Sequence, residues 1–190
     1  MSKAVLISIR PKWCEKIVNG EKTIEVRKTK PKLETPFKCY IYCTLPKYPH
    51  EDFIATNYPM PQFYGGGKVI GEFTCDRIYK IDKDSTDFLF KFGRLSVYKQ
   101  AAEEKCGLCM AMTDDELHGY LGHCQGYGWH ISDLRIYDTP KELSEFKTLC
   151  RVDADCCACP YYNYTKMGCD GRVIGRPPQS WCYVDDVQAK

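Results

Sequence analysis

The sequence predicts an α+β domain built on a small β-barrel, and three features of the chain support this fold class. A strand, a short helix and a second strand follow one another within residues 1–27. Further strand patterns recur along the chain, and helical patterns are inserted between strands that are not adjacent in sequence. The 190 residues are enough for one domain with a full hydrophobic core.

The first strand and helix are predicted from the spacing of apolar residues and from the proline and glycine at their ends. Residues 4–10 are rich in β-branched side chains that alternate between two faces. Pro11 ends this strand and suits the first turn of a helix. Apolar residues then recur at helical spacing over residues 11–19, and Gly20 fits the left-handed position that ends a helix.

The second strand, within residues 20–27, combines charges of both signs with apolar alternation. Alternation places Ile24 on one face and both Glu25 and Arg27 on the other, with Lys22 at the strand entry. We therefore expect one face to pack in the core while the other recognises a polar ligand at the mouth of the barrel.

The remaining elements follow from the same signals. Further strands are predicted at residues 37–45, 68–81, 128–137 and 177–184. Residues 46–64 hold four prolines and predict a long irregular loop. The pattern of residues 84–126 predicts helix, with a capping box formed by Thr113 and Glu116. A short helix is also predicted at residues 140–147.

Charge is distributed unevenly along a chain that is close to neutral. The formal net charge is +2, which by itself does not indicate a nucleic-acid-binding protein. Residues 1–32, however, carry nine lysines and arginines against three acidic residues. This end would attract a phosphate-bearing ligand, although a basic segment can also be a solvated face.

Nothing in the sequence predicts a membrane protein or an exported one. No apolar run approaches the roughly 20 residues that cross a bilayer, and the N-terminus lacks the apolar length of a signal peptide. We therefore expect a cytoplasmic protein whose thirteen cysteines are reduced thiols or metal ligands rather than disulfides. Four cysteines lie singly among apolar residues, where we expect small buried hydrophobes: Cys14, Cys39, Cys43 and Cys75.

The C-terminal cysteines predict a structural zinc site. The spacing Cys156-x2-Cys159 lets two thiolates chelate one tetrahedral ion through a tight turn. We expect Cys150 and Cys169 to complete the site, with Cys157 and Cys182 as substitutes. Zinc is the expected cofactor because four sulfur ligands favour it, and reduced buried thiols are the alternative.

A second cluster combines Cys106-x2-Cys109 with His118, His123 and Cys124. It could form a metal knuckle or a redox pair, but the surrounding pattern shows no redox fold. The alternative is a helical insertion with incidental thiols.

Four segments of the chain resemble a known family. Residues 7–13 (ISIRPKW) and the G-x-K-x-x-E-x-R pattern of residues 20–27 resemble the signature of ASCH domains, and residues 129–134 resemble a later strand of that family. Residues 176–182 also resemble the end of cysteine-tailed ASCH proteins from Gram-positive bacteria and their phages.

The resemblance implies a PUA-like β-barrel with an RNA or modified-nucleoside site near Lys22, Glu25 and Arg27. Some members are amidohydrolases that deacetylate N4-acetylcytidine, and others are reported as ribonucleases. In the amidohydrolases a lysine acts with a threonine three residues later. This chain has Glu25 at that second position, and a carboxylate cannot replace a hydroxyl without changing the chemistry.

The candidate ligand-binding residues supply cations, one acceptor and stacking faces. They are Ser8, Arg10, Trp13, Lys22, Glu25, Arg27, Trp129 and His130. The cations suit a phosphate or carbonyl, the carboxylate suits a base amino group, and the indoles suit stacking. If the protein is an enzyme, Lys22 and Glu25 are the expected catalytic residues.

We expect two parts in the chain. Residues 1–148 form the barrel with a helical insertion at about 85–125, and residues 149–190 form a cysteine-rich extension that closes with a barrel strand. The leading function is RNA or modified-nucleoside binding. The alternatives are a hydrolase acting on a modified nucleoside or RNA, and a zinc-stabilised module that contacts a protein partner, with a phage-encoded protein as one origin of such a module.

The zinc prediction is tested by elemental analysis of freshly purified protein. Four thiolate ligands hold zinc tightly at neutral pH, so we expect near-stoichiometric metal. Protein purified under reducing conditions without any metal would refute the site.

Overall fold

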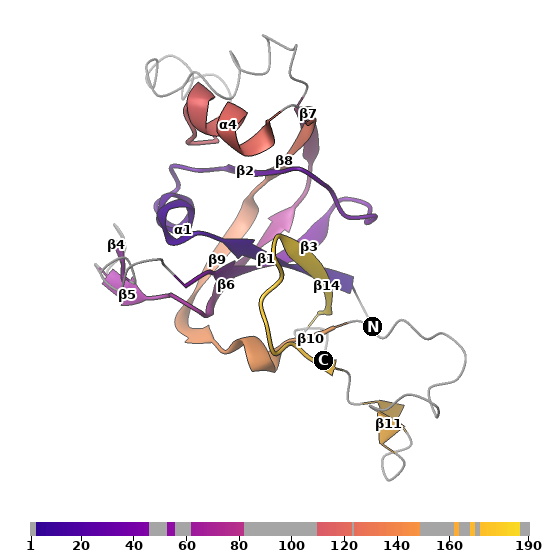
Figure 1. Ribbon diagram of the computed structural model, residues 1–190. Helices are drawn as coiled ribbons and strands as arrows, with labels where there is room; N and C mark the ends of the chain where they lie inside the picture. The colour runs from indigo at the N-terminus through magenta and orange to yellow at the C-terminus, as the bar shows by residue number, and fades with distance from the viewer. Residues whose placement is uncertain are drawn as a thin grey trace.

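Over its described residues, the computed structural model is an α+β fold in which helices α1 and α4 flank a large and a small β-sheet (Figure 1). The described parts of the chain are residues 3–45, 53–55, 62–81, 110–122, 124–148, 162–163, 168–169 and 172–186. The α+β prediction is therefore confirmed over these residues.

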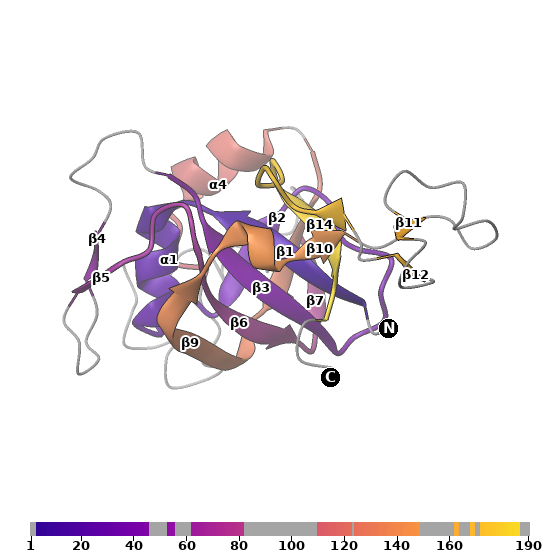
Figure 2. The same cartoon turned by 90° about the horizontal axis from the view of Figure 1, so that it is seen from below.

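The large sheet has seven strands, in the order β13-β10-β14-β1-β3-β6-β9. These strands are β1 (Lys3–Ile9), β3 (Phe37–Cys43), β6 (Val69–Cys75), β9 (Ser132–Lys141), β10 (Lys147–Thr148), β13 (Arg172–Val173) and β14 (Trp181–Asp185). The first strand lies in the middle and pairs parallel with β3 and antiparallel with β14. Figure 2 shows β14 and β10 beside β1, so the end of the chain extends the sheet that its beginning started.

The small sheet has three antiparallel strands, in the order β2-β8-β7. They are β2 (Ile24–Arg27), β8 (Gly126–His130) and β7 (Ile78–Ile81). The sequence predicts one strand at residues 68–81 and one at residues 128–137, but each is divided between the two sheets. Alternation alone cannot show this, because the chain changes sheet through one or two residues without a glycine or proline.

Helix α1 begins and ends where the sequence predicts, and helix α4 begins at the predicted capping box. Helix α1 (Pro11–Val18) has proline at its first residue, and Gly20 follows it with a left-handed φ of 73°. Helix α4 (Asp114–Leu121) has the predicted capping box between Thr113 and Glu116.

Two local predictions differ from the structure. Residues 46–64 are not irregular throughout, because β4 (Phe53–Ala55) and β5 (Gln62–Tyr64) pair as a hairpin. Within residues 140–147 the chain makes only one 3₁₀ turn, η4 (Leu143–Glu145), because β9 continues to Lys141 and β10 begins at Lys147. One further antiparallel pair joins β11 (Tyr162–Asn163) to β12 (Gly168–Cys169).

The core lies on both faces of the large sheet and beneath α4. Helix α1 packs on one face through Cys14, Ile17 and Val18, and α4 covers the small sheet through Leu117 and Leu121. The four cysteines predicted to be buried are all fully buried: Cys14, Cys39, Cys43 and Cys75. That prediction is confirmed.

The pairings of the described strands do not close a barrel. Strands β10, β13 and β14 extend the large sheet beyond β1, while β2, β7 and β8 pair as strands only with one another among the described residues. The helix within the predicted insertion is α4, and residues 85–109 lie outside the described residues. None of the helices in the described part of the chain is long and apolar enough to span a membrane.

Two glycine substitutions test the sheet and helix packing. A Cβ at Gly71 would lie 2.5 Å from the carbonyl oxygen of Arg135, whereas a Cβ at Gly119 in α4 would meet nothing within 4 Å. We expect Gly71→Ala to lower the free energy of unfolding by about 1–3 kcal/mol because backbone atoms would clash. We expect Gly119→Ala to raise it by about 0.5–1 kcal/mol because alanine favours the helix.

Urea unfolding followed by circular dichroism measures both free energies. Equal effects of the two substitutions would contradict the close approach of β6 and β9 at Gly71.

Candidate functional site

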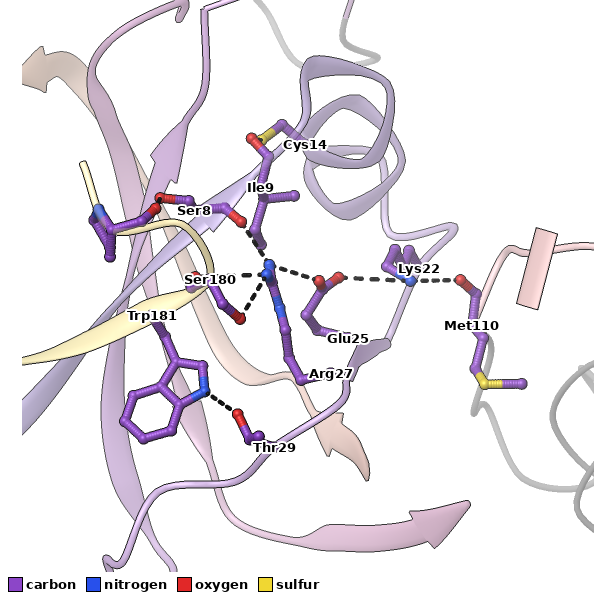
Figure 3. A network of polar contacts seen from close by, with 11 residues as sticks. Ser8, Ile9, Cys14, Lys22, Glu25, Arg27, Thr29, Met110, Ser180 and Trp181 are labelled. Carbon is purple, nitrogen blue, oxygen red and sulfur yellow. Dashed lines mark hydrogen bonds and ion pairs between the residues drawn. The ribbon is translucent and has the colours of Figure 1, made fainter. Parts of the chain in front are cut away.

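Lys22, Glu25 and Arg27 form one buried ionic network (Figure 3). One oxygen of Glu25, Oε1, lies 2.9 Å from Arg27 Nη2, and the other, Oε2, lies 3.6 Å from Lys22 Nζ. The three residues are only 2%, 5% and 6% exposed, respectively. These side chains therefore contact one another within the fold, whereas the sequence predicts a charged face that meets a polar ligand at the mouth of a barrel.

Both faces of β2 are buried, which the alternation pattern did not predict. Ile24 and Val26 pack with Leu117 and Leu121 of α4, as one apolar face requires. The opposite face carries Glu25 and Arg27, and the segment leading into β14 covers it. Charges can occupy this face because each contacts an opposite charge or a backbone carbonyl.

Lys22 is held by two oxygen atoms and an indole ring. Its Nζ donates a hydrogen bond of 2.6 Å to the carbonyl oxygen of Met110, which precedes α4. The same Nζ lies 5.1 Å from the centroid of the Trp13 ring, within the range of a cation–π contact. The Nζ of Lys22 is therefore oriented by Met110 on one side and by Glu25 on the other.

Arg27 joins three distant parts of the chain. Its Nη2 donates to the carbonyl oxygen of Ser8 at 2.6 Å, and its Nη1 lies 3.5 Å and 3.4 Å from the carbonyl oxygen and Oγ of Ser180. Ser8 in turn donates from Oγ to the carbonyl oxygen of Pro178. Ser8 is one of the predicted site residues, whereas Ser180 and Met110 were missed because no local pattern marks a residue that acts through its backbone carbonyl.

Two atoms of the network have no hydrogen-bond partner among the described residues. They are Oε2 of Glu25, an acceptor, and Nε of Arg27, a donor. Buried polar groups are rarely left unpaired, because an unsatisfied group costs about 1–3 kcal/mol. An unsatisfied acceptor and donor on neighbouring side chains are therefore a candidate contact point for a ligand.

Tyr120 and Arg10 lie at the outer side of this network. Burial raises the pKa of the Tyr120 phenol, while the nearby charges of Arg27 and Arg10 act to lower it. Tyr120 is 37% exposed, and its ring lies 5.5 Å from Nζ of the exposed Lys28. Tyr120 and Lys28 are absent from the predicted site, although Tyr120 follows the capping box by one helical turn.

The other predicted ligand residues occupy different surroundings. Trp129 is fully buried and packs edge-on against Phe37 and tilted against Trp181, so it offers no open stacking face here. His130 is partly buried, and its Nδ1 lies 2.6 Å from Asp76 Oδ1. Burial raises the pKa of Asp76, but the hydrogen bond and charge of His130 outweigh it, and the pKa is lowered.

The described residues contain no group of three or more His, Cys, Asp or Glu side chains that could hold a metal ion. The predicted zinc ligands Cys150, Cys156 and Cys159 lie outside the described residues, as does the side chain of Cys169. Burial raises the pKa of Cys182, a substitute ligand, to about 11. The second predicted cluster contributes only two side chains to the described part of the chain, His118 and Cys124, because its other three members lie outside.

Comparison with known proteins gives a match in structure alone. No protein-family model matches the chain, and no curated protein matches it significantly. The crystal structure of the ASCH protein from Zymomonas mobilis matches 95% of this chain and 86% of its own length, with 16% sequence identity and a TM-score of 0.50. A serine-to-alanine mutant of that protein matches 95% of this chain and 87% of its own length, with 17% identity and a TM-score of 0.51.

The chain has the ASCH fold. The resemblance read from residues 7–27 is confirmed at the level of the fold, and the cysteine-tailed subtype stays a prediction. Within this ASCH fold the pattern G-x-K-x-x-E-x-R places Lys22 at the entry of β2 and both Glu25 and Arg27 on its inner face. Since a fold does not define an activity, the function of this protein depends on the chemistry of these side chains.

Removing the charge of Glu25 tests the network as a structural unit. Glu25→Gln leaves two buried cations without their carboxylate, so we expect a loss of about 3–5 kcal/mol in the free energy of unfolding. Glu72→Gln is the matched control, because Glu72 is also buried but accepts its hydrogen bond from the neutral phenol of Tyr137.

Urea unfolding of both variants gives the comparison. If Glu25→Gln costs no more than Glu72→Gln, the ion pairs of Glu25 do not stabilise the fold.

Proposed function

We propose that this protein binds RNA or a modified nucleoside at the ionic network of β2. The observation that carries the proposal is that two buried polar atoms of this network, the acceptor Oε2 of Glu25 and the donor Nε of Arg27, have no hydrogen-bond partner among the described residues. A ligand that offers a donor to the carboxylate of Glu25 and an acceptor to the guanidinium of Arg27 would complement both atoms.

The edge of a nucleobase has this arrangement. Its amino or imino hydrogens lie next to a carbonyl oxygen or ring nitrogen, and single-stranded RNA exposes such edges. Glu25 would accept from the base, and Arg27 would donate to it. The cation of Lys22, 3.6 Å from Glu25, keeps the carboxylate oriented.

The partly exposed residues beside the network suit the rest of a nucleotide. Tyr120 marks the side from which a ligand approaches and can stack on a base, a contact worth about 1–3 kcal/mol. Arg10 and Lys28 are exposed cations near this tyrosine and suit a phosphate. In the proposed arrangement the two sheets together form a PUA-like barrel whose mouth is at Lys22.

Two other functions remain as alternatives. A hydrolase acting through Lys22 and Glu25 would need Lys22 to serve as a base, but its Nζ donates to Met110 and faces Glu25. A zinc-stabilised module for a protein partner would depend on the cysteine-rich segment rather than on this network.

The proposal is tested by equilibrium binding of single-stranded RNA and of a panel of free and N4-acetylated nucleosides. We expect Glu25→Gln to weaken binding at least tenfold, because the amide presents a donor where the ligand needs an acceptor. Arg10→Ala removes an exposed cation and should weaken RNA binding severalfold without changing the fold. Glu72→Gln is the control and should bind as the wild type does.

Circular dichroism at the assay temperature confirms that each variant is folded. Wild-type binding by both folded variants would refute a site at this network. Release of acetate from N4-acetylcytidine by the wild-type protein, lost in Lys22→Met, would instead establish the hydrolase.

A further inference from the structure

Three exposed lysines follow β2 at alternate positions. Lys28, Lys30 and Lys32 lie in the segment that leaves the network after Arg27, and all three are exposed. We call them the lysine row. Among the described residues, none of the three forms an ion pair with a carboxylate, in contrast to Lys12, which pairs with Glu116, and Lys68, which pairs with Glu142.

Two hydrogen bonds fix this segment to β14 of the large sheet. Trp181 Nε1 donates to Thr29 Oγ1 at 3.1 Å, and the backbone N–H of Lys32 donates to the hydroxyl of Tyr183 at 2.7 Å. Between them Pro31 is buried. The lysine row is therefore held in place from beneath, whereas a solvated basic tail would have no such contacts.

Each of the first two lysines lies over an aromatic ring from a different element. Lys28 Nζ is 5.5 Å from the ring centroid of Tyr120 on α4, and Lys30 Nζ is 5.7 Å from that of Tyr127 on β8. Tyr127 pairs with Arg27 across the strands, so both rings border the network. Two of the three lysines thus lie beside aromatic rings that border the network.

We infer that the lysine row binds the phosphate backbone of single-stranded RNA whose base occupies the network, so the ligand is an RNA strand rather than a free nucleoside. The inference rests on the proposed function. Proteins that hold single strands combine a track of cations for the phosphates with aromatic rings for the bases, and this surface supplies both. An acidic protein segment would use the lysines but would have no need of the rings.

The test uses a fluorescein-labelled single-stranded RNA of mixed sequence, about 12 nucleotides long, within the usual range of site sizes. The triple variant Lys28→Ala, Lys30→Ala, Lys32→Ala is compared with a control that removes three lysines from the large sheet. The control substitutes Lys3, Lys141 and Lys147 by alanine and so loses the same net charge.

We expect the lysine-row variant to bind this RNA at least tenfold more weakly at low salt, while the control stays within twofold of the wild type. Each phosphate contact on a single strand adds about 0.7 to the slope of log affinity against log salt. Loss of three contacts should therefore lower that slope by about 2, which a merely structural effect would not do.

The outcomes separate this inference from the proposed function. Equal affinities and equal salt slopes for the two triple variants would contradict RNA binding by the lysine row. An equal loss of binding to poly-glutamate would also overturn it, since the row would then attract any polyanion. If the lysine row is required for RNA binding while Glu25→Gln has no effect, phosphate binding by the lysine row is supported and base binding at the network is refuted.

Discussion

The structure depends on the burial of one carboxylate between two cations. Glu25 lies on a four-residue strand covered on both faces, and its charge is balanced by Arg27 at 2.9 Å and Lys22 at 3.6 Å. Charges removed from water are costly unless they are paired and hydrogen-bonded. The surrounding elements therefore supply carbonyl oxygens from Ser8, Met110 and Ser180.

This requirement explains why the ends of the chain meet. Arg27 reaches Ser8 on the first strand and Ser180 before the last one, and the backbone N–H of Ser8 donates to the carbonyl oxygen of Ser180 at 2.9 Å. The closing strand β14 then pairs with β1. One guanidinium thus links the small sheet to the first and the last strand of the chain, which are neighbours in the large sheet.

The same network connects the interior to the surface. Lys22 and Arg27 are buried, but Trp13, Tyr120 and the exposed lysines lie around them. A recognition site of this kind has a rigid inner layer for a base and a charged outer layer for phosphates. In this proposal the inner layer selects the ligand and the outer layer attracts it.

The sequence by itself determined the local elements and the chemistry of β2. Pro11, Gly20 and the capping box at Thr113 each act through neighbouring backbone atoms, so their effects could be predicted. The motif residues Lys22, Glu25 and Arg27 were also identified.

Tertiary structure alone decided that these charges are buried, which strands change sheet, and that Ser180 and Met110 complete the network from 153 and 88 residues away. Such contacts depend on packing between distant segments, and a backbone carbonyl leaves no signature in the side-chain pattern.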